Sequence, residues 1–93
     1  MNEPREIRLK RLRIRSWRRG TREMDLILGA YADGPLAGLD DAALDAYEAL
    51  LEEGDQDLYA WIAGGTVAAG RHGDTIERLR AFIASADIGR PPA

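Results

Sequence analysis

The sequence predicts an all-α fold, a compact bundle of five short helices. Apolar residues recur at intervals of three and four along most of the chain, which is the period of an amphipathic helix. Asp and Gly residues stand between these stretches, where they are expected to cap and end helices. No segment shows the clustered β-branched residues and turn pair that indicate a hairpin. One domain is expected over residues 1–93, with 86–93 as a loose tail.

The first helix is expected between Arg5 and Arg18. Arg, Lys and Leu are good helix formers, and this outweighs the short alternation Ile7-Arg8-Leu9, which also suits a strand. The apolar residues of this segment divide between two helical faces, so the sequence leaves open which face is buried. One face carries Ile7, Ile14 and Trp17, and the other carries Leu9 and Leu12.

The second and third helices have clearer boundaries. Gly34-Pro35 is expected to end the second helix, because Gly can adopt the left-handed conformation and Pro cannot continue a helix. Asp40 is the expected N-cap of the third helix, with Leu39 and Leu44 placed for a hydrophobic staple and Gly54 at the far end. The apolar stripe of the second helix consists of Met24, Ile27, Leu28 and Tyr31.

The fourth and fifth helices are also predicted from caps. Asp55 is the expected N-cap of the fourth helix, which ends before Gly64-Gly65. Asp74 is the expected N-cap of the fifth helix, and Glu77 holds the reciprocal position of a capping box. The predicted core consists of Met24, Ile27, Leu28, Tyr31, Leu44, Tyr47, Leu51, Leu58, Trp61, Ile62, Leu79, Phe82 and Ile83, with Ile76 on the same face of the fifth helix.

Composition excludes several classes of function. The chain has no cysteine, which excludes disulfides, thiolate metal sites and Cys nucleophiles and suits a reducing compartment. No apolar run reaches the roughly 20 residues of a membrane span, so no membrane insertion is expected. The Arg-rich amino terminus lacks a signal-peptide core, and Glu3 and Glu6 are unlike the acid-poor composition of a mitochondrial presequence. A cytoplasmic bacterial protein, monomeric when free, is the simplest expectation.

Charge is distributed unevenly along the chain. Residues 1–23 hold nine Arg and Lys against three Glu, a charge of +6, whereas residues 24–93 carry −9 of the total of −3. Such a division favours a partner with complementary patches. The basic stretch Arg8 to Arg15 also suggests nucleic-acid binding, but the acidic remainder repels a duplex and no recognised nucleic-acid motif is present. No nucleic-acid partner is therefore expected.

The residue types needed for catalysis are sparse. His72 is the single histidine, and a histidine between Arg71 and Gly73 is expected to be a solvated loop side chain. The pair Glu52-Glu53 lies at the expected carboxyl end of a helix, where carboxylates are unfavourable. It is interpreted as a solvated face in preference to an acidic contact. The sequence predicts no catalytic residue, no metal ligand and no enzyme activity.

The corner between the first two helices is the richest in charge. Gly20 can end one helix and cap the next, and Glu23 then lies at the third position, where its carboxylate can reach back to the cap. This reading leaves Arg18, Arg19 and Arg22 unexplained, because cations are unfavourable at a helix amino terminus. A partner that offers carboxylates or carbonyl oxygens explains them. The expected partner-binding residues are Arg15, Arg18, Arg19, Gly20, Arg22 and Glu23.

A resemblance to a known family rests on two segments. Residues 16–28 read Ser-Trp-Arg-Arg-Gly-Thr-Arg-Glu-Met-Asp-Leu-Ile-Leu and contain the signature Arg-Gly-x-x-Glu at Arg19, Gly20 and Glu23. Residues 55–62 read Asp-Gln-Asp-Leu-Tyr-Ala-Trp-Ile and match the pattern Asp-x-Asp-Leu-aromatic-x-Trp. In this order, the two segments resemble the succinate dehydrogenase flavinylation (assembly) factors, which are five-helix bundles of similar length.

The resemblance implies a function. It implies a chaperone that binds the apo flavoprotein subunit of succinate dehydrogenase, and in bacteria also fumarate reductase, and promotes covalent attachment of FAD to that subunit. It implies no tightly bound cofactor in this chain, because the FAD belongs to the partner, and whether this chain touches it stays open. The same resemblance leaves an alternative, an antitoxin-like or regulatory protein-binding module, and a basic-helix nucleic-acid binder is the third hypothesis.

Overall fold

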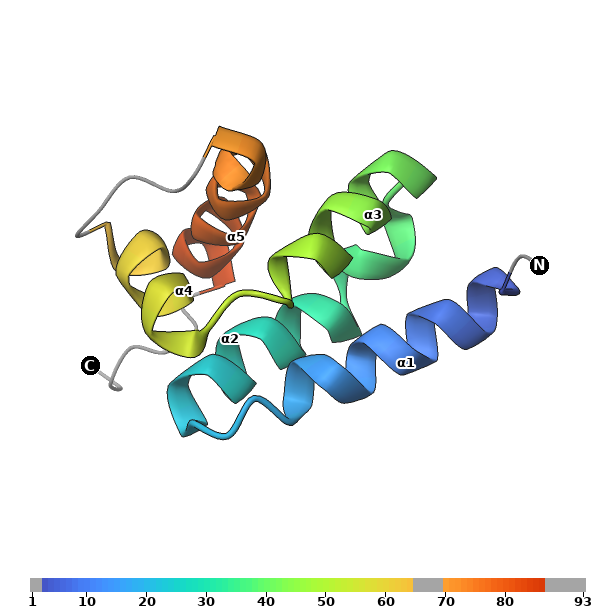
Figure 1. The fold of residues 1–93 in the computed structure, drawn as a ribbon, viewed down its shortest axis with the longest axis horizontal. Helices are drawn as coiled ribbons and strands as arrows, with labels where there is room; N and C mark the ends of the chain where they lie inside the picture. Colours follow the sequence, from blue (N-terminus) through green and yellow to red (C-terminus); the bar gives the residue numbers. More distant parts are fainter. Residues whose placement is uncertain (1–2, 65–69, 87–93) are drawn as a thin grey trace.

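The computed structural model describes residues 3–64 and 70–86, and every long element in these ranges is an α-helix (Figure 1). Two short 3-10 turns, η1 (Pro35–Gly38) and η2 (Gly70–His72), precede α3 and α5. The all-α prediction and its five helices are confirmed. The helices are α1 (Arg5–Trp17), α2 (Arg22–Asp33), α3 (Asp41–Leu50), α4 (Asp55–Ala63) and α5 (Gly73–Ala86).

The helices form two connected groups. α1 and α2 lie side by side as an antiparallel pair along the long axis of the molecule, and α3 lies above them near the amino-terminal end of α1 (Figure 1). α4 and α5 pack against each other over the other end of the pair, and α5 also contacts α2 and α3. In the part of the chain that the structure describes, no helix is long and apolar enough to cross a bilayer. The predicted loose tail lies outside the described residues from residue 87 onward.

The core uses the leucine face of α1. Leu12 is buried and Leu9 packs partly against the core, so Ile7 and Ile14 are left exposed. Trp61 is only half-buried, in contrast to the prediction, and Trp17 is partly exposed. The buried apolar residues are Leu12, Met24, Ile27, Leu28, Tyr31, Ala32, Leu36, Leu44, Tyr47, Leu50, Leu51, Leu58, Ile62, Ile76 and Leu79, with Phe82 and Ile83 partly buried beside them.

Side-chain contacts at Trp17 and at Ser16 hold α1 against α2 and α3. The Trp17 ring lies so close to the backbone of α2 that a Cβ at Gly29 would overlap it, and its indole Nε1–H donates to Asp33 at 3.2 Å. On the inner side, the buried Ser16 and Tyr47 hydroxyls share a hydrogen bond of 2.6 Å between α1 and α3. Burial raises the pKa of Tyr47, so the phenol is neutral in this cluster.

Several helix ends differ from the predicted caps. Asp40 caps α3 as predicted, accepting from the Ala43 backbone N–H at 2.8 Å. Gly34, however, has φ −119° rather than a left-handed conformation, because the chain turns directly into η1. Gly64, with φ +84°, is the glycine that ends its helix in the left-handed conformation.

The two remaining predicted aspartate caps are wrong. Gly54 caps α4, and Asp55 is the first residue of that helix, where its carboxylate pairs with Arg19. α5 begins at Gly73, one residue before Asp74. Glu77 therefore forms no capping box and pairs with Arg80 at 3.0 Å instead.

Candidate partner-binding surface

Arginines of the amino-terminal segment form a ladder of ion pairs with carboxylates of α3 and the residues that follow it. We call this set the arginine ladder. Its first four arginines recur every three or four residues along one side of α1, and Arg19 follows just beyond the end of that helix. The facing carboxylates have a similar spacing, which brings each pair into register. The pairs and their N···O distances are Arg5–Asp41 at 3.2 Å, Arg8–Asp45 at 2.6 Å, Arg8–Glu48 at 3.1 Å, Arg11–Glu48 at 2.9 Å, Arg15–Glu52 at 3.2 Å and Arg19–Asp55 at 2.8 Å.

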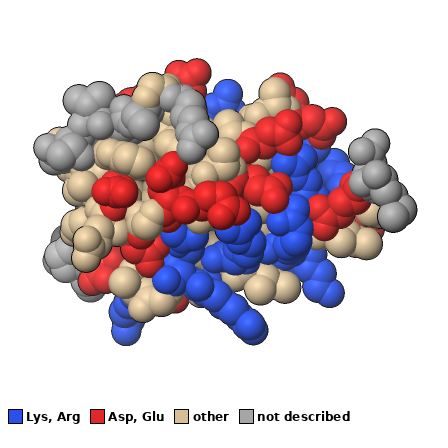
Figure 2. Space-filling model, in the orientation of Figure 1, with Lys and Arg blue, Asp and Glu red and all other residues tan. Residues whose placement is uncertain are grey.

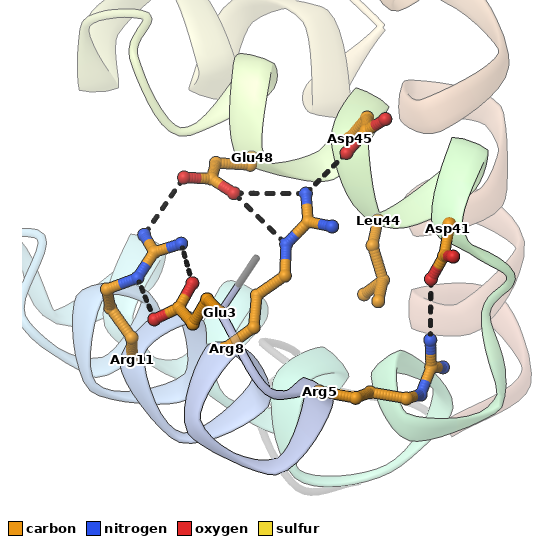
Figure 3. Close-up of a pocket in the computed structure, with 8 residues that line it drawn as sticks. All are labelled: Glu3, Arg5, Arg8, Arg11, Asp41, Leu44, Asp45 and Glu48. Carbon is orange, nitrogen blue, oxygen red and sulfur yellow. Dashed lines mark hydrogen bonds and ion pairs between the residues drawn. The ribbon is translucent and has the colours of Figure 1, made fainter. Parts of the chain in front are cut away.

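The pairs of the ladder from Arg5 to Arg11 line a groove of about 500 Å³ between α1 and α3, with Leu44 among the other lining residues (Figure 3). Hydrogen bonds from Arg11 and then Arg8 hold the pKa of Glu48 below its usual value. A hydrogen bond to Asp45 raises the pKa of Arg8. Both groups are therefore charged at neutral pH, and the walls of the groove are already electrostatically paired.

The ladder accounts for most of the uneven charge. A band of Lys and Arg runs directly beside a band of Asp and Glu on the face shown in Figure 2. The arginines of the ladder neutralise carboxylates of α3 and of the segment from Glu52 to Asp55, so their charge is balanced within the chain. The arginines that suggested nucleic-acid binding include Arg8, Arg11 and Arg15, and all three are engaged in this way.

Arg19 is an internal group rather than a solvated charge, because its side chain is only 12% exposed. Its guanidinium donates to the Leu51 carbonyl at 2.6 Å and the Glu53 carbonyl at 2.7 Å, in addition to its ion pair with Asp55. Its backbone N–H donates to Asp25 at 2.6 Å. Arg19 thus satisfies carbonyls at the end of α3 and joins the corner to the start of α4.

Gly20 adopts φ +102°, a backbone conformation that favours glycine. It is not the N-cap of α2 as predicted, because that position is Thr21. Glu23 is consequently the second residue of α2, and its carboxylate forms no capping box. It is exposed at the helix amino terminus, where a negative charge is stabilised, and no ion pair or hydrogen bond of this side chain occurs with other described residues.

The other predicted site residues separate into two groups. Arg15 belongs to the arginine ladder. Arg18 and Arg22 are exposed and form no ion pair within residues 3–64 and 70–86. Arg18 follows the carboxyl terminus of α1, where cations are favourable, so the expected electrostatic conflict concerns Arg22 alone.

Glu23 lies beside a shallow hollow of about 430 Å³ between the amino-terminal turns of α2 and α4. Tyr59 contributes an exposed ring, and Gln56 contributes an amide. The hollow thus joins both segments on which the sequence resemblance rests, although the site prediction named neither Tyr59 nor Gln56. A free carboxylate, an amide and an aromatic face can recognise a partner by hydrogen bonding and packing. The lining residues are Thr21, Glu23, Met24, Asp55, Gln56 and Tyr59.

His72 is a buried structural residue, which overturns the prediction of a solvated loop histidine. Its Nε2 lies 2.8 Å from a Glu53 carboxylate oxygen, and its ring packs against Trp61 with centroids 5.7 Å apart. Glu53 is accordingly engaged with His72, whereas Glu52 is exposed as expected and pairs with Arg15 at 3.2 Å. No group of three or more His, Asp or Glu side chains arranged to hold a metal ion occurs among the described residues.

Comparison with known proteins identifies a family that this chain matches. The model of a protein family described as "Flavinator of succinate dehydrogenase" matches residues 10–83, which include all of α2 to α4 and most of α1 and α5. The matched range contains both sides of the hollow and three of the five arginines of the ladder.

Individual fungal relatives are named "Succinate dehydrogenase assembly factor 2, mitochondrial". The protein from Mycosarcoma maydis is 42% identical over 60 residues, which cover 64% of this chain and 25% of the relative. That from Meyerozyma guilliermondii is 44% identical over 59 residues, covering 63% and 44%. The matched part is thus less than half the length of either relative. Because the family model matches well over half of this chain, the chain belongs to the flavinator of succinate dehydrogenase family.

Proposed function

We propose that this chain is an assembly factor that binds the flavoprotein subunit of succinate dehydrogenase and promotes covalent attachment of FAD to it. The observation that carries the proposal is the hollow, where Glu23 and Tyr59 come together from the two family-like segments. Family membership supplies the class of partner. Fumarate reductase, as a second flavoprotein client, belongs to the same proposal.

Glu23 is the central recognition group in this proposal. Its carboxylate is accessible at the edge of the hollow, so it can accept hydrogen bonds from a partner without first breaking an internal ion pair. Burial of a charged contact on binding makes its truncation costly, at about 2–5 kcal/mol. Arg19 and Gly20 act indirectly by fixing the corner that carries Glu23.

The chain acts without chemistry of its own in this proposal. The flavin supplies the reactivity, and the flavoprotein supplies the residue to which FAD becomes attached. The assembly factor prefers the flavinylation-competent arrangement of the subunit and shifts its population accordingly. The factor is monomeric when free and acts in the cytoplasm.

The test is covalent flavin on the flavoprotein subunit in a strain that lacks this factor. Wild-type factor is expected to restore flavin fluorescence of the denatured subunit, and Glu23→Gln is expected to lose most of it while keeping its thermal melt. Glu6→Gln is the matched control, because Glu6 is also exposed and forms no ion pair with other described residues. Wild-type flavin levels with Glu23→Gln would show that Glu23 at the hollow is not needed to recognise the flavoprotein subunit.

A further inference from the structure

The side of α1 that faces away from α3 and the core is a second unusual surface. Ile7 is 54% exposed, Ile14 44% and Trp17 38%, and these three side chains recur along one side of the helix. Lys10, Arg13 and Arg18 lie beside them, exposed and without an ion pair within the described ranges. We call these six residues the outer face of α1. The core takes Leu12 and the arginine ladder takes Arg8, Arg11 and Arg15, so neither use accounts for the outer face.

Trp17 makes the outer face a rigid surface. Its ring is seated against Gly29 of α2, and its indole N–H is held by Asp33 at 3.2 Å. A ring fixed in this way loses little conformational entropy on binding, and Trp and Arg are the residue types that contribute most at protein interfaces. Leu26, 38% exposed, lies one turn before Gly29 on α2 and adds another exposed apolar side chain to the same helix pair.

The chemistry of the outer face specifies its partner. Apolar side chains flanked by unpaired cations complement a surface with apolar side chains flanked by carboxylates. An anionic lipid surface is a poorer match, because the Trp17 indole N–H is already engaged by the Asp33 carboxylate. The same Asp33 uses the indole N–H that a membrane-interface Trp presents to water and headgroups.

We propose that the outer face of α1 is a second docking surface for the flavoprotein subunit and that it receives an acidic amphipathic segment of that protein. This inference rests on the proposed function and adds a contact distinct from the hollow. The hollow presents a carboxylate, whereas the outer face presents cations around an apolar centre. The two surfaces therefore select different chemistry on the same partner and fix its orientation.

The experiment measures binding of purified apo flavoprotein subunit by calorimetry at low and at physiological salt. Arg13→Glu is expected to weaken binding about five- to tenfold, with a larger effect at low salt, and Ile14→Ser about tenfold with little dependence on salt. Arg78→Glu is the matched control, because Arg78 is an exposed arginine of α5 without an ion pair among described residues, and the charge change is the same. All three residues are exposed, so the variants are expected to melt like the wild type.

The outcomes separate the two proposals. If the wild-type chain does not bind the subunit, the proposed function fails, and the inference fails with it. If the wild type binds and Arg13→Glu and Ile14→Ser bind as tightly as Arg78→Glu, the proposed function stands and the second surface is overturned.

Binding to vesicles of phosphatidylglycerol and phosphatidylcholine tests whether the outer face of α1 binds a membrane instead. A loss of vesicle binding by both variants, with subunit binding unchanged, assigns the outer face to lipid and overturns the inference.

Discussion

The arginine ladder and the hollow carry similar residue types but use them differently. In the ladder, Arg8 and Arg11 converge on Glu48, and each charge has a partner within the chain (Figure 3). At the hollow, Glu23 remains unpaired among the described residues, although the neighbouring corner holds three arginines. The difference teaches that a dense cluster of charged residues can serve to hold the helices of this protein together. A charge without an internal partner instead indicates a surface that is available to another protein.

The largest effect is expected from removal of Arg19. Arg19→Ala leaves the Asp55 carboxylate and the Leu51 and Glu53 carbonyls without their donor, at a cost of about 2–3 kcal/mol in the free energy of unfolding. Urea denaturation followed by circular dichroism measures it. Arg18→Ala is the control, with an expected change below about 0.5 kcal/mol because the side chain is exposed. Equal stability of the two variants would contradict the internal role of Arg19.

An intermediate effect is expected at Gly20. Its φ of +102° is strained for a residue with a side chain, so Gly20→Ala is expected to cost about 1–2 kcal/mol. Nothing lies within 4 Å of a Cβ built at this position, so the cost is one of backbone conformation rather than of a clash. A thermal melt measures it, with Gly38→Ala as the control, since Gly38 has equal space and is not among the glycines with positive φ. An unchanged melt of Gly20→Ala would show that the corner relaxes freely.

A smaller, pH-dependent effect is expected at Glu48. Its pKa is lowered in the folded state, so its ion pairs stabilise the fold above the ordinary glutamate pKa of about 4.3 and lose that effect as pH falls. Glu48→Gln is expected to cost about 1 kcal/mol at pH 7, because the pairs with Arg8 and Arg11 are only partly shielded from water. The difference from the wild type should shrink in melts below pH 4. A difference that stays constant with pH would exclude ionisation as its cause.

Much of the fold was predictable from local patterns. The helical stripe at Met24, Ile27 and Leu28, the Asp40 cap and the Gly64 stop are all determined by residues close in sequence. The buried face of α1 was left open, because Ile14 and Leu12 are equally apolar and only the packing against α2 and α3 distinguishes them. The sequence therefore predicted the positions of the helices along the chain better than it predicted which helix faces are buried.

The candidate site was less predictable, because its main interactions join distant segments. The predicted roles of Arg19 and Asp55 each rested on neighbours in sequence, whereas the structure pairs the two residues across 36 positions. His72 was misjudged for the same reason, since its partner Glu53 lies 19 positions away. Tyr59 could have been found only through its place in the second family-like segment.

The central claim is that paired charges stabilise this fold whereas the unpaired Glu23 binds the partner. The most direct measurement compares Glu23→Gln with Glu48→Gln, which make the same chemical change, for thermal stability and for affinity to the purified flavoprotein subunit. The account predicts that Glu23→Gln melts like the wild type but binds at least tenfold more weakly, and that Glu48→Gln melts lower but binds normally. Normal binding by Glu23→Gln, or a loss of binding by both variants in proportion to their stability, would contradict it.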